Sequence, residues 1–136
     1  MTGPTTNTYT LSGRSALPFA EAVERVRETL KEEGFGILTE IDVQATLKAK
    51  LGEDREPYLI LGACSPPDAH HALQLEPEVG TLLPCNVVVY EQDGETRVSG
   101  IDPAAMLGIV GNPSLEPVAA EIRSRIERAL RKVWDQ

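Results

Sequence analysis

The sequence is poor in aromatic residues and cysteine, and it contains no long apolar run. Aromatic residues make up only 4 % of the chain, so a core must be built mainly from Leu, Ile, Val and Ala. No apolar segment approaches the roughly 20 residues that a membrane-spanning helix needs. The first residues carry neither a basic start nor an apolar stretch, so they do not resemble a secretory signal.

Basic residues are scarce relative to acidic ones. The chain has 13 Lys and Arg against 21 Asp and Glu, for a formal net charge of −8. A surface of this sign repels phosphate, so neither nucleic acid nor an anionic membrane is expected as a partner. We expect a cytosolic protein, in which two cysteines are more often free, metal-binding or redox-active than joined in a permanent disulfide.

Several catalytic signatures are also missing. The sequence has no glycine-rich dinucleotide or P-loop motif, no Gly-x-Ser-x-Gly elbow and no His-Glu-x-x-His pair. Dinucleotide, nucleotide triphosphate, serine-hydrolase and zinc-protease chemistry therefore have no support. Whether the protein is an enzyme is left open by the residues alone.

The 136 residues suffice for one domain, which we divide into a flexible leader over residues 1–7 and a single domain over 8–136. Five strands are expected, at 8–14, 35–41, 58–63, 85–91 and 96–101. Helices are expected between them and at the end of the chain, at 18–33, 43–51, 66–75, 103–107 and from 114 onward. Asp42 can cap the second helix and Gly52 ends it, while the last helix should begin at Ser114 as its N-cap and carry a continuous apolar stripe. An Asp-Gly turn at 92–95 predicts that the last two strands form an antiparallel hairpin.

The two cysteines are the residues best placed for chemistry. Cys64 closes one apolar strand and Cys85 opens the next, so antiparallel pairing would bring both to the same end of the sheet. Cys64 also precedes a proline-initiated helix, whose positive end would lower the pKa of its thiol. If the two side chains share a face, the sulfurs could form a reversible disulfide. The alternative is that both are small buried hydrophobes.

Other polar residues offer weaker candidates. His70 and His71 follow Cys64 on the same predicted helix, and a Cys/Cys/His group would suit zinc or cuprous ion, although solvent-facing histidines are the simpler interpretation. Asp42 and Lys48 could flank a cleft as an acid–base pair, or serve as a helix cap and a solvated face. Asn86, beside Cys85, needs partners for its amide if it is buried, and it could point into a binding site.

These segments together resemble the family called domain of unknown function 302, from about Tyr9 to the final helix. The resemblance rests on 34–35, 39–43, 47–52, 57–66 and 82–90. It implies a small α+β fold with a TATA-binding-protein-like antiparallel sheet of about five strands backed by helices, and a homodimer. It marks Cys64, Cys85 and Asn86 as signature residues, while Ser65 stands where the family usually has Asn. The family has no settled activity.

Three hypotheses about function follow. The first is a binding or sensing module, in which Cys64 and Cys85, with Ser65 and Asn86 nearby, line a small pocket for a soft metal ion, a sulfur species or another small ligand. The second is a thiol–disulfide enzyme or redox switch that uses the same two cysteines. The third is a dimeric interaction domain with structural thiols. No cofactor is required by the sequence, and Cys64 and Cys85 are the expected ligands if a metal binds.

Overall fold

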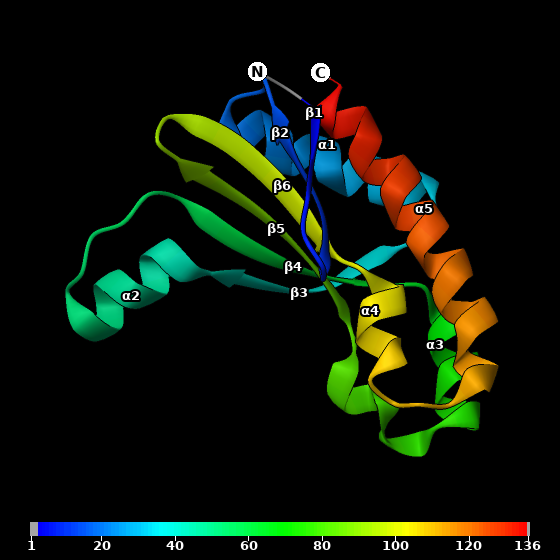
Figure 1. Cartoon of the computed structure of the whole chain (residues 1–136). Helices are drawn as coiled ribbons and strands as arrows, with labels where there is room; N and C mark the ends of the chain where they lie inside the picture. The colour runs from blue at the N-terminus through cyan, green and yellow to red at the C-terminus, as the bar shows by residue number, and fades with distance from the viewer. Residues whose placement is uncertain (1–2, 136) are drawn as a thin grey trace.

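A computed structural model describes residues 3–135 as a six-stranded antiparallel sheet with helices (Figure 1). The strands are β1 (Gly3–Thr6), β2 (Thr10–Ser15), β3 (Gly36–Asp42), β4 (Tyr58–Cys64), β5 (Cys85–Gln92) and β6 (Glu95–Ile101). The α-helices are α1 (Phe19–Glu32), α2 (Val43–Leu51), α3 (Pro66–Leu75), α4 (Pro103–Gly108) and α5 (Glu116–Trp134). Two short 3-10 helices are η1 (Pro77–Leu82) and η2 (Pro113–Leu115). The strand order is β1-β2-β6-β5-β4-β3, which confirms the α+β class with six strands instead of five.

The additional strand, β1, occupies most of the predicted flexible leader. Gly3–Thr6 pair antiparallel with β2, and residues 1–2 lie outside the described part of the chain. The connecting Asn7 accepts hydrogen bonds from the backbone N–H groups of Tyr9 and Thr10, at 3.0 and 2.7 Å. The segment shows no apolar alternation because its pairing depends on the backbone, which sequence patterns do not report.

Helices α1 and α5 cover one face of the sheet and enclose the core. The apolar stripe predicted for the last helix is buried, as is the corresponding face of α1. The strands contribute side chains that are fully buried beneath these helices, including Leu61, Val87, Val89 and Val98. Burying each such side chain stabilises the fold by roughly 1.5–3 kcal/mol. None of the helices in the described residues combines the length and apolar character needed to cross a membrane.

The single tryptophan closes this core against a glycine. The indole N–H of Trp134 donates a hydrogen bond to the carbonyl oxygen of Val98, at 3.0 Å. A Cβ atom placed on Gly13 would lie 2.6 Å from the indole ring, which is closer than packed atoms approach. Glycine at this position in β2 therefore allows the end of α5 to lie directly on the sheet.

The cap residues expected from local sequence are found at α2 but not at the start of the last helix. Asp42 accepts a hydrogen bond from the N–H of Ala45 at 2.9 Å, and Gly52 ends α2 with a φ of 68°. The predicted N-cap at Ser114 is wrong. Asn112 instead accepts a hydrogen bond from the N–H of Ser114 at 3.0 Å and caps η2, which leads directly into α5.

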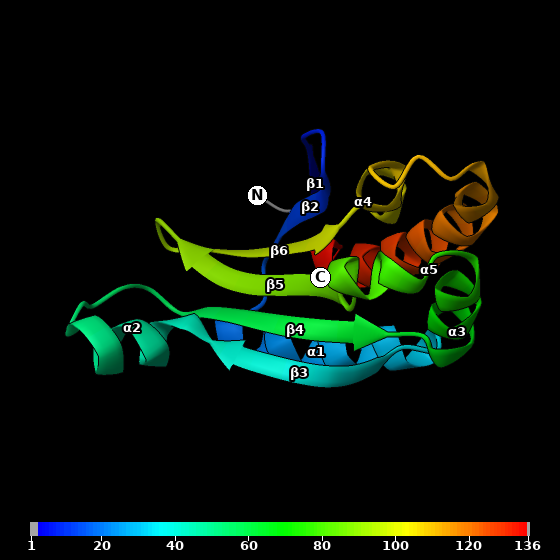
Figure 2. The ribbon, with the colours of Figure 1, turned by 90° about the horizontal axis from the view of Figure 1, so that it is seen from below.

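Within residues 3–135 no helix covers the opposite face of the sheet, and we call it the open face. Figure 2 shows β3 and β4 in front of α1, while α2 lies at the far end of the molecule from α3 and α5. Strand register assigns to the open face every second residue of each strand, because side chains alternate along a strand. Its central residues are Arg14, Ile41, Tyr58, Ile60, Asn86, Val88, Tyr90, Arg97 and Ser99.

Candidate functional site

The two cysteines lie at the same end of neighbouring antiparallel strands, as predicted. Cys64 is the last residue of β4 and Cys85 the first of β5. The residue directly opposite Cys85 is Ala63, however, so Cys64 is one position beyond the matched pair. Because side chains alternate along a strand, the two thiols belong to opposite faces of the sheet. The condition for a disulfide, that the two side chains share a face, is therefore not met, and both cysteines are free.

Their surroundings differ accordingly. Cys85 is only 4 % exposed and lies with Val87 on the face covered by helices. Cys64 is half-buried, on the same face as Gly62. A Cβ atom on Gly62 would collide with the Thr39 side chain and lie 2.7 Å from the ring of Pro84, so this part of the open face is already filled.

Both thiols are protonated at neutral pH. Burial, with a smaller contribution from nearby Cys64, raises the pKa of Cys85 from 9.0 to about 11. Burial also raises the pKa of Cys64, so the lowering that a position before α3 can produce is not found, in line with the alternative of a buried hydrophobe. Since the thiolate is the nucleophile and the metal ligand, neither residue is activated for those roles.

A small hollow lies beside the cysteines at the end of β4. Its volume is about 20 Å³, and its walls include Cys64, Cys85, Phe35 and Ile122. A space of this size holds about one water molecule. A larger hollow of about 220 Å³ opens between α4 and α5, and neither cysteine lines it.

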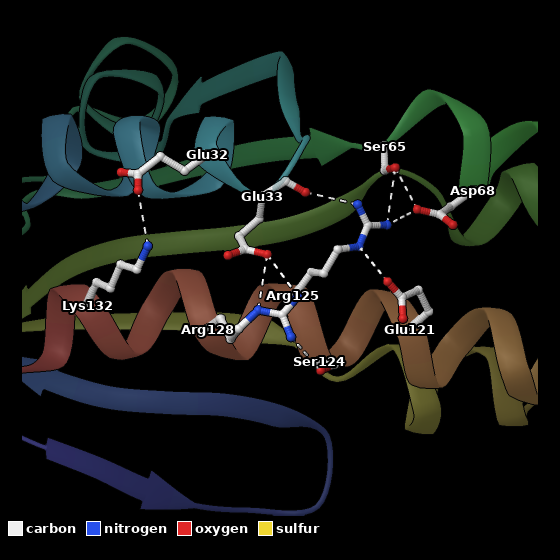
Figure 3. Close-up of polar contacts among 9 residues, drawn as sticks. All are labelled: Glu32, Glu33, Ser65, Asp68, Glu121, Ser124, Arg125, Arg128 and Lys132. Carbon is white, nitrogen blue, oxygen red and sulfur yellow. Dashed lines mark hydrogen bonds and ion pairs between the residues drawn. The ribbon is translucent and has the colours of Figure 1, made fainter.

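The start of α3 is held by a polar cluster that sequence reasoning missed (Figure 3). Arg125, on α5, forms an ion pair with Asp68 and donates a hydrogen bond to the carbonyl oxygen of Glu33 at 2.9 Å. Ser65 donates to Asp68 at 2.6 Å and accepts from Arg125 at 3.3 Å. The guanidinium also lies 4.9 Å from the centre of the Phe35 ring. The cluster therefore joins α1, α3 and α5 and gives Ser65 a structural role.

The remaining predicted site residues do not converge. His70 and His71 are exposed, and within residues 3–135 no group of three or more potential ligands could hold a metal ion. Asn86 is exposed on the open face, so its amide needs no buried partner.

Asp42 and Lys48 do not form the acid–base pair that was considered for them. Asp42 caps α2, as described above, and Lys48 forms an ion pair with Asp54 at 2.9 Å on the surface. These contacts match the helix cap and solvated face that were the alternative interpretation.

Comparison with known proteins places this fold in a family. The family model for the domain of unknown function DUF302 matches residues 11–133. The chain belongs to the DUF302 family. A crystal structure of an uncharacterized conserved DUF302 protein from Bacillus stearothermophilus is similar, with 33 % sequence identity and a TM-score of 0.88. The match covers 93 % of this chain and 99 % of that one. No curated protein matches the sequence.

Membership in DUF302 thus rests on nearly the whole fold, from β2 to the end of α5. Neither the family model nor the similar crystal structure names an activity, a ligand or a partner. A functional hypothesis for this DUF302 domain must therefore come from its own surfaces.

Proposed function

We propose that this DUF302 domain is a homodimeric interaction module that associates through the open face of its sheet. The observation that carries the proposal is a set of neighbouring apolar side chains on a sheet face without helices. Ile60 stands between Ile41 on β3 and Val88 on β5, and Ile41 is 49 % exposed. Contiguous apolar surface of this kind marks interaction sites more often than isolated exposed residues do.

Aromatic side chains extend the same surface. Tyr58 and Tyr90 face each other across β4 and β5, with ring centroids 5.1 Å apart and an angle of 25° between the rings. Tyrosine supplies large contact area at low cost in conformational entropy, which is why it is enriched at protein interfaces. The apolar side chains and the stacked rings together form a patch suited to another sheet surface.

Helix α2 also lacks the packing expected of a folded element. None of its residues is buried, and Leu51 at its end is 68 % exposed. Nine-residue helices are only marginally stable without tertiary packing, and here the caps at Asp42 and Gly52 supply local support. A second copy that packed against α2 would provide the missing burial.

The two hypotheses that depend on the cysteines have less support. Binding of a soft metal or sulfur species at Cys64 and Cys85 needs thiolates that converge on an open pocket, and thiol–disulfide exchange needs the same convergence. Opposite faces, raised pKa values and a hollow of about 20 Å³ favour structural thiols instead.

Light scattering coupled to size exclusion tests the proposal. We expect a mass twice the 14.8 kDa of the chain for the unmodified protein and a monomer for Ile41→Asp. Leu73→Asp is the matched control, because Leu73 is similarly exposed at 42 % but lies on α3. A monomeric unmodified protein, or a dimer that Ile41→Asp leaves intact, would overturn the proposal. Circular dichroism of each variant verifies that the fold is retained.

A further inference from the structure

A row of arginine and tyrosine side chains crosses the open face at one end of the sheet. Tyr58 lies opposite Tyr90, Tyr90 opposite Arg97, and Arg97 opposite Arg14, so four neighbouring strands each contribute one residue. Arg55 extends the row, with its guanidinium 5.0 Å from the centre of the Tyr58 ring. We call these five residues the arginine–tyrosine row.

The row carries more positive charge than its own chain neutralises. Arg14 and Arg97 are directly opposite each other, an arrangement that destabilises a sheet unless an anion compensates it. They share one carboxylate, that of Glu95, at 3.2 Å from Arg14 and 3.6 Å from Arg97. The Nε atoms of both arginines are buried, and among the described residues neither has a hydrogen-bond acceptor. Further carboxylates at this position would therefore be favourable.

The composition of the row suits a protein partner. Arginine and tyrosine are the residue types that, with tryptophan, most often dominate binding energy at protein interfaces. The side chains stand on an extended sheet surface, and the arginine side chains are partly exposed, at 26 % for Arg14 and 32 % for Arg97. They are thus accessible to carboxylates from a second chain.

The same chain carries an acidic segment at this end of the sheet. Glu53 and Glu56 are exposed in the connection between α2 and β4, which leads directly into Tyr58. The intervening Asp54 is already paired with Lys48, at 2.9 Å. Glu53 and Glu56 form no ion pair with any residue in the described part of the chain.

Two-fold symmetry can bring these two features together. Consider a two-fold axis that lies between two facing sheets and runs parallel to their strands, near β5. This axis places the same strand ends of the two sheets together, and it places the β4 side of each sheet against the β6 side of the other. The strand order places β4 on one side of β5 and β6 and β2 on the other. Such an axis therefore carries the acidic connection before β4 in one copy over β6 and β2 of the second copy, where Arg97 and Arg14 lie.

We propose that Glu53 and Glu56 of each copy bind Arg97 and Arg14 of the other copy. This inference rests on the proposed self-association and adds the contact that sets its geometry and specificity. Because the dimer is symmetric, the contact occurs twice, and opposite charges brought together in this way select the correct partner.

Mixing two charge-reversed chains tests this contact. One chain carries Arg14→Glu and Arg97→Glu, and the other carries Glu53→Arg and Glu56→Arg. Each chain alone would place like charges together at both contacts, so we expect at least about a tenfold weaker dimer for each. The mixture restores opposite charges at both contacts, so we expect a heterodimer within about threefold of the unmodified affinity. Because the first chain is more acidic than the second, general repulsion also favours the mixture, so the control for it must change the net charge by the same amount.

Native mass spectrometry of the mixture gives the readout. Lys31→Glu with Lys132→Glu is the control for charge reversal on the helical side, and it should leave the dimer unchanged. If the double glutamate reversal at the row prevents folding, Arg14→Gln with Arg97→Gln should still weaken the dimer about tenfold. The charge contact alone is overturned if the unmodified protein dimerises and Ile41→Asp abolishes the dimer, but the two reversed chains show no preference for each other. A monomeric unmodified protein would overturn both proposals.

Discussion

Arg125 and Arg128 lie one turn apart on α5, and both contact Glu33, but their surroundings differ. The Arg125 side chain is 16 % exposed and bonds to the Glu33 carbonyl oxygen, Ser65 and Asp68. The Arg128 side chain is 55 % exposed and bonds to the Glu33 carboxylate at 3.0 Å. Replacement of each by alanine therefore compares a partly buried arginine with an exposed one on the same helix.

The structure sets the size of the expected difference. Arg125→Ala removes hydrogen bonds made by a charged donor, each with a net contribution of about 1.5–3 kcal/mol. It also removes the contact with the Phe35 ring, of about 0.5–1 kcal/mol, and leaves Asp68 without its cation. Because the side chains of Arg125 and Asp68 are partly hydrated, some of this loss is offset, and we expect the free energy of unfolding to fall by about 2–4 kcal/mol. For Arg128→Ala we expect a smaller change, because the arginine side chain itself is solvated and only its partner Glu33, at 15 % exposed, is largely buried.

Urea unfolding followed by Trp134 fluorescence measures both variants, at one protein concentration because self-association would add to apparent stability. A double-mutant cycle with Asp68→Ala should give a coupling energy of about 1–3 kcal/mol between the two side chains. Equal losses for Arg125→Ala and Arg128→Ala, or a coupling energy near zero, would refute a structural role for the cluster.

Two further predictions concern the core. Gly13→Ala should destabilise the fold by about 1–3 kcal/mol, because its methyl group would overlap the Trp134 ring. Gly108→Ala is the control and should have little effect, because no atom lies within 4 Å of the added Cβ. A small change for Gly13→Ala in urea unfolding would contradict this packing. The raised pKa of Cys85 means that the folded state holds the thiol proton more tightly, so this contribution to stability is fully present below pH 9 and is lost as the pH rises toward 11. Unfolding free energies of the unmodified protein and Cys85→Ala should converge by up to about 3 kcal/mol over that window, and parallel pH curves would show that burial of the thiol has no such effect.

Local sequence was sufficient for elements whose geometry is determined within a few residues. The stripe on α5 and the Asp42 and Gly52 caps of α2 were predicted correctly because they depend on helical periodicity and on neighbouring backbone groups. The hairpin was predicted because Asp-Gly sequences favour turns with positive φ at both residues. Asp93 and Gly94 do adopt positive φ, at 52° and 79°.

The relation between the cysteines was beyond such reasoning. Which face each thiol occupies depends on the register between β4 and β5, and a shift of one residue moves every side chain to the other face. The segment between the two strands, which contains α3 and η1, carries no periodic signal from which that register could be predicted. The Arg125 cluster was missed for a similar reason, since Asp68 is 57 positions away along the chain. Strand β1 was missed because backbone pairing leaves no side-chain pattern.

Helix α5 contributes more buried residues to the core than α1 does, and it is the last element that the structure describes. During synthesis, β2 to β6 leave the ribosome before this cover exists. Their inner face, with Val87, Val89 and Val98, therefore lacks the part of its cover that α5 supplies until that helix has been made. Since nascent chains grow by about 5–20 residues per second, this interval lasts seconds.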